Sequence, residues 1–541
     1  MSAIFKSRVR NKILLNKLVE NPLEIVKTHF RDKQHIGFSG FTGIGGPKVI
    51  PNALCEYTRH HHLNMPGSEK QMRFNLYVGA SCGVEEDKMA LENMILKRTP
   101  HQVGKQIRKR INSGDTLFFD KNLSLFPQEL LYGFYNKDIT LPDPNKTDAL
   151  PSNVLDIAVI EATGIDEDGG IILGPSVGAT PEFLAGASKI IIEVNTTIKE
   201  MKGLHDLVLQ KNPPYRQPLN YTKVDQRLGS EKLYIDLNKV VAVVESQIED
   251  HIPDNTPADE NSAKIASHLI TFFKNEVKHN RMPKNLLPLQ SGIGNVANSV
   301  IGGLANSGFK NLQVFTEVFQ DSFLDLFANG SLDVASSTSI RLTPKGMSRL
   351  SQNWDSWSKK IILRPQTVSN NPELIRRLGC IAMNTPVEVD IYGHANSTCV
   401  LGSKMLNGIG GSREFLTSAK YSIMHTMSTR PTPTDPYGIT SIVPFVSHVD
   451  QTEHDIDAFV TEQGLADLRG LAPRERALEI INKCAHPVYR PILLKYFNDS
   501  IKRCNGKMHE PHDLHKCFEM YFNLEERGSM RAFKKTDEKL H

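Results

Sequence analysis

The sequence has neither a strong charge of one sign nor a long hydrophobic run. Its 541 residues carry 64 basic and 60 acidic side chains, a formal net charge of +4. That balance is too weak to indicate a nucleic-acid partner, because nucleic-acid-binding proteins carry clustered positive charge. No uncharged apolar segment approaches the ~18 residues that a membrane-spanning helix needs. The apolar stretches, of which 239–244 (KVVAVV) is typical, have the length of buried strands. We therefore expect neither nucleic acid nor a membrane as a partner.

Paired cysteines and metal-binding spacings are also missing. The seven cysteines are scattered along the chain, and no two have the Cys-x-x-Cys spacing. Such an odd set argues against a disulfide framework and favours a reducing compartment. Two histidine-rich stretches lack the spacing of a structural zinc site, so we expect exposed surface there and no metal. These stretches hold His60, His61 and His62, and His509, His512 and His515 with Cys504 and Cys517.

Acidic residues are absent from the N-terminal segment, where the first is Glu20. The basic residues Lys6, Arg8, Arg10 and Lys12 are interleaved there with apolar ones. This pattern is typical of a mitochondrial transit segment, and equally of a basic first helix. The residues alone do not separate these two interpretations.

What the sequence does contain indicates an α/β protein. Hydrophobic residues make up 39% and there are 37 glycines, as in an ordinary globular protein of two to four domains. Short apolar segments are each followed by a glycine turn and a helical stretch, which predicts βαβ units and mainly parallel sheets. Strands are predicted at 35–38, 74–78, 157–160 and 312–315.

Internal similarity indicates a duplication. Segment 178–191 resembles segment 410–423, and both place Glu-Phe-Leu in the same register, 232 residues apart. Gly45 and Gly294 lie in similar turns but are 249 residues apart, so the first half has 17 extra residues. We place these in the Pro-, Asp- and Asn-rich segment 136–153. The chain is therefore expected to hold two related α/β halves.

The polar segment 249–257, which contains two prolines, predicts the boundary between the halves. Asn261 or Ser262 can cap a following helix with an apolar stripe at Ile265, Leu269, Phe272, Phe273 and Val277. We expect an N-terminal domain at 1–250 and a C-terminal domain at 251–541. The polar tail after Phe497 is expected to form a helical appendage.

Two Gly-x-Ser-x-Gly motifs allow a serine-hydrolase hypothesis. They contain Ser81, which follows a predicted strand, and Ser176, with His425 or His448 as a possible base. Two matches in one chain show how permissive this pattern is, and the duplication puts Gly408 opposite Ser176. The sequence therefore disfavours a serine nucleophile.

The loop at 292–297 has the pattern Gly-x-Gly-x-x-Ala between a predicted strand and a helix. Glu317 lies 23 residues beyond Gly294 at the end of a strand, as in a dinucleotide-binding fingerprint. Bare glycines at a helix N-terminus, however, offer N–H groups to any anion or developing oxyanion. Glu317 is thus a candidate ribose ligand, base, nucleophile or structural carboxylate.

Several motifs together resemble those of the acetyl-CoA hydrolase/transferase family, from about Arg8 to beyond residue 520. They are 290–295 (QSGIGN), 316–321 (TEVFQD), 407–412 (NGIGGS), 447–455 (SHVDQTEHD) and 464–470 (GLADLRG). The resemblance implies a class I CoA-transferase with two homologous open α/β domains. It implies Glu317 as the nucleophile and backbone N–H groups of Ile293 and Gly411 as an oxyanion hole. It also implies CoA contacts at Gly292, Ile293, Gly294, Asn295, Val296, Asn407 and Gly411, and polar active-site residues at Asn370 and Glu462.

The resemblance further implies transfer of CoA from an acyl-CoA such as succinyl-CoA to acetate, with hydrolysis of acetyl-CoA when water replaces the acceptor. CoA would act as a substrate, with no tightly bound cofactor, and the protein is expected to be a homodimer. Fungal members are associated with mitochondria, so we expect that location, with the cytoplasm as the alternative. An NAD-dependent oxidoreductase and an inactive CoA-binding protein remain alternatives, and the preferred acyl group is not readable from the sequence.

Overall fold

A computed structural model describes residues 1–65, 67–253 and 259–532, which form two compact units. The first unit comprises Met1–Asn255, Asn311–Leu378 and Asn407–Glu414, and the second Thr256–Lys310, Gly379–Leu406 and Phe415–His541. This grouping differs from the expected division at residue 250. Segments 311–378 and 407–414 belong with the N-terminal residues because they hydrogen-bond to them: Ile340 N–H donates to the Pro175 carbonyl, and Val177 N–H to the Thr338 carbonyl, both at 2.8 Å.

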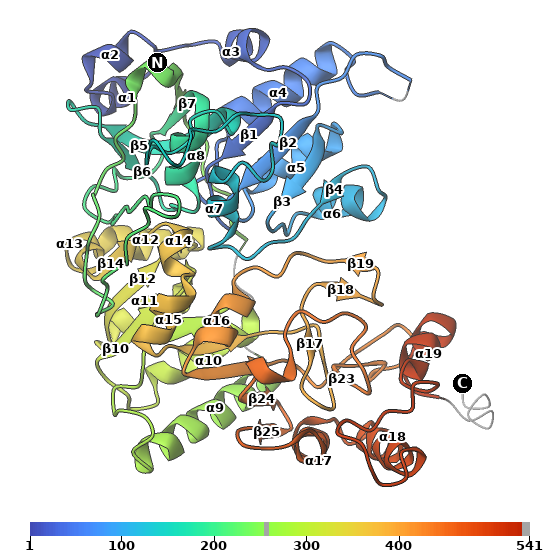
Figure 1. Cartoon of the computed structure of the whole chain (residues 1–541). Helices are drawn as coiled ribbons and strands as arrows, with labels where there is room; N and C mark the ends of the chain where they lie inside the picture. Colours follow the sequence, from blue (N-terminus) through green and yellow to red (C-terminus); the bar gives the residue numbers. More distant parts are fainter. Residues whose placement is uncertain (66, 254–258, 533–541) are drawn as a thin grey trace. The chain divides into compact units, whose positions relative to one another are not determined.

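The main sheet of the first unit is parallel except at one short strand (Figure 1). Its order is β4 (Leu117–Phe118), β3 (Ile95–Thr99), β2 (Phe74–Val78), β1 (His35–Phe38), β5 (Leu155–Ile165), β7 (Ala187–Asn195) and β8 (Val240–Ser246), with β6 (Ile171–Leu173) antiparallel to β5. Parallel strands covered on both faces need apolar side chains on both. Such strands are apolar runs that can be recognised in the sequence. The expected strands at 35–38 and 74–78 coincide with β1 and β2, and 157–160 falls within β5.

Helices cover this sheet. They are α3 (Pro22–His29), α4 (Val49–His60), α5 (Val84–Leu91), α6 (Lys105–Asn112), α7 (Phe126–Leu131) and α8 (Thr180–Gly186). The basic N-terminal segment forms α1 (Ala3–Arg8) and α2 (Lys12–Leu15). Arg8 donates to the carbonyls of Thr163, Asn195 and Ile198, so this segment packs on the first unit. The expected insertion at 136–153 contains no helix or strand.

The remaining strands of the first unit come from the second half of the sequence. Parallel strands β10 (Leu312–Phe315), β12 (Leu332–Ser337) and β14 (Ile361–Leu363) lie in that order, and β11 (Val318–Phe319) pairs with β13 (Ser339–Ile340). Helices α11 (Asp321–Ala328), α12 (Pro344–Gln352), α13 (Trp354–Trp357), α14 (Gln366–Ser369) and α15 (Pro372–Leu378) connect or follow them. The predicted strand at 312–315 is β10.

The second unit contains parallel strands β9 (Leu289–Ser291), β15 (Ile381–Asn384), β20 (Tyr421–His425) and β24 (Ala458–Thr461), with β25 (Gly464–Asp467) antiparallel to β24. Helices α9 (Glu260–Lys278) and α10 (Asn295–Ala305) pack against each other. The cap of α9 is Asp259, whose carboxylate accepts the Ser262 N–H at 2.7 Å, and not Asn261 or Ser262 as expected. The expected stripe is buried at Ile265, Leu269, Phe272 and Phe273.

Strand order bears out the duplication. Strands β9, β15, β20 and β24 repeat the order of β1, β5, β7 and β8, and β10, β12 and β14 repeat that of β2, β3 and β4. Helix α16 (Ser412–Ser418) lies 232 residues after α8. The chain ends in helices α17 (Pro473–Cys484), α18 (Arg490–Arg503) and α19 (Glu519–Arg527), so the helical appendage begins before Phe497. Within the described ranges, no helix has the length and apolar character to cross a membrane.

Candidate active site

Glu317 lies two residues after the end of β10 and directly before β11, so its backbone is fixed on both sides. Its carbonyl accepts the N–H groups of Thr338 at 2.9 Å and Ser339 at 3.1 Å. Its carboxylate is half-buried, and Oε1 accepts a hydrogen bond from Asn370 Nδ2 at 2.5 Å. Burial raises the pKa of Glu317 to about 7, although the Asn370 bond acts in the opposite direction. A carboxylate with this pKa exchanges its proton near neutral pH.

Asn370 is fully buried at the end of α14, and its amide has a defined orientation. Ser369 Oγ donates to Asn370 Oδ1 at 2.8 Å, which leaves the Asn370 NH₂ group for Glu317. Helix α14 is itself fixed at its first residue. Gln366 N–H donates to the Gly178 carbonyl at 2.9 Å, and Gln366 Nε2 to the Leu123 carbonyl at 2.6 Å. Residues of the first half of the sequence thus position the partner of Glu317.

Gly411 lies against the Glu317–Asn370 pair. A Cβ atom built on Gly411 would be 1.7 Å from Glu317 Oε1 and 2.2 Å from Asn370 Nδ2, so a larger residue would have to displace both side chains. The loop that carries Gly411 is held by Asp120, whose Oδ2 accepts the Ile409 N–H at 2.7 Å. Asn407, at the start of this loop, has a buried Oδ1. The structure therefore brings Glu317, Asn370 and Gly411 together.

Two further glutamates of the first unit are buried carboxylates that the sequence analysis used only as markers of duplication. Glu414 accepts Ser124 N–H at 2.8 Å, Ser124 Oγ at 2.5 Å and Leu123 N–H at 3.2 Å. Glu182, its counterpart, accepts Thr367 Oγ1 at 3.0 Å. Burial raises the pKa of Glu414 to about 8, assisted by the charge of Glu317, and burial raises the pKa of Glu182 to about 7. The sequence signal for this burial was a glutamate at the same position of both Glu-Phe-Leu repeats, next to apolar residues of the helix.

The expected CoA loop belongs to the second unit, between β9 and α10. Gly292 N–H donates to the Met383 carbonyl at 3.0 Å, and the chain then turns into the helix at Gly294, whose φ is +123°. That φ lies in the region that favours glycine. Ile293 is 40% exposed, Gly294 and Asn295 are exposed, and Val296 is half-buried. The first turn of α10 has no side-chain cap.

Glu462 also belongs to the second unit, between β24 and β25. Its carboxylate accepts Ser428 N–H at 2.8 Å, Ser428 Oγ, and Gln463 Nε2 at 2.9 Å. Burial opposes ionisation of Glu462, but the bonds from Ser428 and Gln463 outweigh it and lower the pKa. The pKa of Glu462 is therefore shifted in the opposite direction to that of Glu317.

The serine hypothesis gains no support from the hydroxyl contacts. Ser81 Oγ is buried and accepts the Val103 N–H at 3.1 Å, and Ser176 Oγ donates to the Ile44 carbonyl at 2.9 Å. His425 and His448 belong to the second unit, where they contact Thr385 and Asp450. All seven cysteines are free, and His60, His61 and His62 are exposed as expected. In the second stretch the expectation is wrong for His512, which is half-buried because it packs against Tyr392, and for Cys517, which is buried.

Comparisons with known proteins match the two domains of one family to successive parts of the chain. The sequence model of the acetyl-CoA hydrolase/transferase N-terminal domain matches residues 3–245, and that of the C-terminal domain matches residues 346–497. A Kluyveromyces lactis protein named acetyl-CoA hydrolase is 57% identical over 98% of this chain and 99% of its own. A Saccharomyces cerevisiae protein of the same name is 54% identical over 98% of both chains.

Solved structures give the same fold at low identity. RipA from Yersinia pestis is 19% identical, with a TM-score of 0.66 over 91% of this chain and 98% of its own. The 4-hydroxybutyrate CoA-transferase of Porphyromonas gingivalis is 18% identical, with a TM-score of 0.58 over 91% and 98%. The expected fold class, mainly parallel sheets with helices in two CoA-transferase-like domains, is confirmed. On the evidence of its sequence and fold, the chain belongs to the acetyl-CoA hydrolase/transferase family of enzymes.

Proposed function

We propose that this enzyme transfers CoA from succinyl-CoA to acetate and also hydrolyses acetyl-CoA, with Glu317 as the nucleophile. The observation that carries the proposal is the carboxylate of Glu317, half-buried, hydrogen-bonded to Asn370 and in contact with Gly411. The relatives are named acetyl-CoA hydrolase, which supports the hydrolysis. One structural neighbour is named a CoA-transferase, which supports the transfer.

The chemistry proceeds through acyl transfer at Glu317. A carboxylate oxygen of Glu317 attacks the thioester carbonyl and the C–S bond breaks. CoA leaves as the thiolate, and a mixed anhydride of succinate and Glu317 remains. The thiolate attacks the glutamyl carbonyl, which releases succinate and leaves a glutamyl-CoA thioester. Acetate attacks that thioester to form a second anhydride, and the thiolate then takes the acetyl group and frees Glu317. Water in place of acetate gives hydrolysis, so exclusion of water decides between the two outcomes.

The chain's own groups supply orientation and charge stabilisation. Asn370 holds one oxygen of Glu317, which leaves the other for attack. The N–H group of Gly411 would stabilise the tetrahedral oxyanion, and the family resemblance implies the same role for the N–H group of Ile293. Removal of one such donor typically costs ~10²–10³ in rate. Glu414, with the higher pKa, holds a proton while Glu317 ionises, which limits repulsion between the two. Because only ionised Glu317 attacks, the rate of its acylation should rise with pH through about 7.

The proposal is tested by Glu317→Ala. We expect hydrolysis and transfer each to fall on the order of 10⁴-fold or more, as when other nucleophiles are removed. Equilibrium binding of CoA should survive. Borohydride reduction of the wild type after incubation with acyl-CoA should convert the Glu317 thioester to an alcohol, detectable by mass spectrometry of the peptide.

Exposed Glu525 provides a matched control, and Glu525→Ala should leave both activities unchanged. Full turnover by Glu317→Ala would exclude the nucleophile. An inactive CoA-binding protein would bind acyl-CoA without exchange of labelled acetate. An NAD-dependent enzyme would bind nicotinamide cofactor and leave acyl-CoA intact.

A mitochondrial location and a homodimer belong to the same proposal. The support for both is the family resemblance, whose fungal members are associated with mitochondria. The basic N-terminal segment adds none, because Arg8 hydrogen-bonds to carbonyls of the first unit as part of the fold. Subcellular fractionation and analytical ultracentrifugation of the full chain test these two points.

A further inference from the structure

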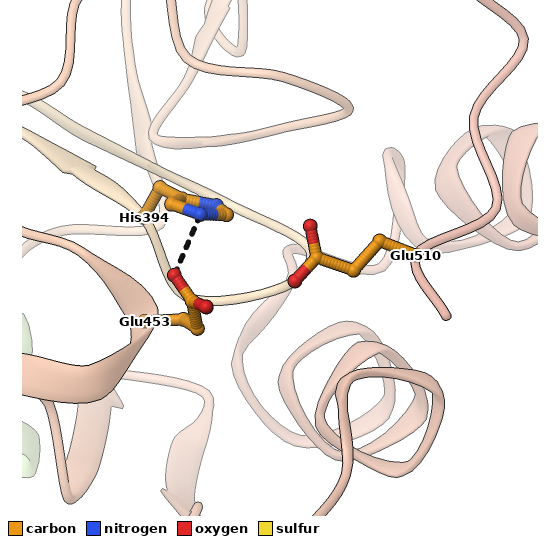
Figure 2. Close-up of side chains that lie close together, drawn as sticks. All are labelled: His394, Glu453 and Glu510. Atoms are coloured by element: carbon orange, nitrogen blue, oxygen red, sulfur yellow. Dashed lines mark ion pairs between the residues drawn. The ribbon is translucent and has the colours of Figure 1, made fainter. Parts of the chain in front are cut away.

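A histidine and two glutamates from distant parts of the sequence converge in the second unit. His394 lies in the turn between β16 (Glu388–Asp390) and β17 (Ala395–Asn396). Glu453 begins the short helix η3 (Glu453–Asp455), and Glu510 lies in the segment between α18 and α19. Figure 2 shows the imidazole and the two carboxylates directed towards a shared space. These three residues are far apart in the sequence and have no recognisable ligand spacing, so the group was not predicted from the sequence.

The imidazole of His394 has a fixed orientation. Its Nδ1 lies 3.0 Å from Asp390 Oδ2, and Asp390 is 1% exposed. Asp390 Oδ1 in turn accepts the N–H groups of Tyr392, Gly393 and His394, each at 3.0 Å. Nε2 therefore faces the shared space, 2.8 Å from Glu453 Oε2. Histidine ligands of metals are usually oriented in this way: one ring nitrogen pairs with a carboxylate, and the other ring nitrogen faces the metal site.

The distances suit a metal ion after a small adjustment. One donor atom each of His394, Glu453 and Glu510 lies within 4.8 Å of the other two, and the described part of the chain contains no second group of this kind. Metal–nitrogen and metal–oxygen bonds of ~2.0–2.2 Å place donors ~3–4 Å apart. A side-chain rotation of Glu453 or Glu510, both half-buried, would bring the donor atoms from within 4.8 Å to this separation. One imidazole with two carboxylates favours a divalent transition ion such as Zn²⁺ or Mn²⁺ over a softer metal.

The local charges are compatible with a dication. Asp390, Glu453 and Glu510 contribute three negative charges, and Arg476, whose Nη1 donates to the Glu453 carbonyl at 2.6 Å, contributes one positive charge. A proton on His394 leaves a net charge of −1, whereas neutral His394 with a divalent ion brings the sum to zero.

We propose that His394, Glu453 and Glu510 bind a divalent transition-metal ion, with Zn²⁺ as the probe, and that the ion fastens the C-terminal segment to the β16–β17 turn. Glu510 is the ligand from that segment. The adjacent residues already contact the same turn: Tyr392 Oη donates to the Pro511 carbonyl at 2.5 Å, and the rings of Tyr392 and His512 lie 4.9 Å apart. The ion would add a third, charged link between the two segments.

The test is calorimetric titration of the chelator-treated full chain with Zn²⁺, with retained metal measured after dialysis. We expect one Zn²⁺ per chain. His394→Asn and Glu510→Gln should each weaken binding by at least ~10-fold. Because the tail contains other histidines, His515→Asn and Glu525→Gln, at exposed positions, serve as matched controls and should bind as the wild type does.

A second readout follows the C-terminal segment itself. Zn²⁺ should slow proteolysis after α18 in the wild type and in both controls, but not in Glu510→Gln. No retained Zn²⁺, or equal binding by Glu510→Gln and the wild type, would overturn the proposal and leave a protonated His394 paired with Glu453 and Asp390. None of these measurements depends on the activity at Glu317.

Discussion

At the scale of single residues, the missing side chain of Gly411 leaves the space in which the candidate nucleophile, Glu317, lies. Gly411 needs no special backbone angle. It is required because its missing side chain is the space that Glu317 and Asn370 occupy. The same close approach brings the Gly411 backbone near the carboxylate, where an oxyanion donor is expected. Space, rather than turn geometry, is therefore the constraint at this position.

Gly411→Ala should consequently lower kcat on the order of 10²-fold while the KM for acyl-CoA changes less. Its Cβ would displace Glu317 Oε1 and the donor of Asn370, so the attacking group would be misaligned without loss of the remote binding contacts. Steady-state kinetics of hydrolysis and transfer give this split. Gly302→Ala is the control, since its Cβ would meet nothing within 4 Å. Wild-type kcat for Gly411→Ala would contradict the packing argument.

The sequence predicted Glu317, Asn370 and Gly411 as site residues through family resemblance, and the structure shows them in contact. It did not reveal that Glu182 and Glu414 are buried carboxylates. A glutamate on a helix is ordinarily a surface residue. Its burial depends on what packs over that face, here α14 and the segment at Leu123 and Ser124.

At the scale of elements, the short helix α14 directs side chains towards three partners. Gln366 reaches the Leu123 carbonyl, Thr367 reaches Glu182 and Asn370 reaches Glu317. Four residues are too few for a hydrophobic period, so this helix could not be predicted from the sequence. The chain is also held two residues before the helix begins. Arg364, 1% exposed, ion-pairs with buried Asp206 and donates to Ser336 Oγ at 2.7 Å.

Arg364→Met should destabilise the fold by about 3–5 kcal/mol, because it leaves the Asp206 carboxylate buried without its cation. The midpoint of thermal unfolding measures this effect. Arg349→Met is the comparison: Arg349 is 33% exposed beside Asp325, and such a pair contributes ~0–1 kcal/mol. Equal midpoints for the two variants would show that the buried pair does not hold the β14–α14 connection.

At the scale of the whole molecule, buried ionisable groups act on stability in opposite directions. Burial raises the pKa values of Glu182, Glu317 and Glu414, so the unfolded chain releases protons that the folded chain keeps. Their contribution is lost as pH rises from about 4.5 to 7 or 8. Burial lowers the pKa of His101 and His205 to about 4, and their contribution is lost as pH falls from 6.5 to 4. Single-residue differences are needed to separate the two sets.

Glu182→Gln removes one such carboxyl group while keeping an amide oxygen for Thr367. We expect its unfolding free energy to match the wild type near pH 5 and to exceed it at pH 8, on the order of 3 kcal/mol at most. Denaturant titrations at the two pH values measure the change. Glu525→Gln, exposed, should show no pH-dependent difference. A constant difference at both pH values would mean that Glu182 does not titrate in this range.

The sequence also predicted the α/β class, several strands and the duplication, because apolar runs and glycine turns are local signals. It could not predict which strands share a compact unit. Segment 311–378 packs with the first half through contacts such as Gly178 N–H to Thr338 Oγ1 at 3.0 Å. Pairings of that kind are between residues far apart in the chain and leave no periodic trace.

That grouping has a consequence for biosynthesis. The chain passes between the two compact units after residues 255, 310, 378, 406 and 414. The N-terminal 255 residues therefore leave the ribosome without the strands and loop that complete their unit. At ~5–20 residues per second, the missing segments arrive roughly 8–30 seconds later. Throughout that interval the nascent protein exposes the surfaces that its own later segments will cover, so we expect it to bind chaperones that shield unfinished chains.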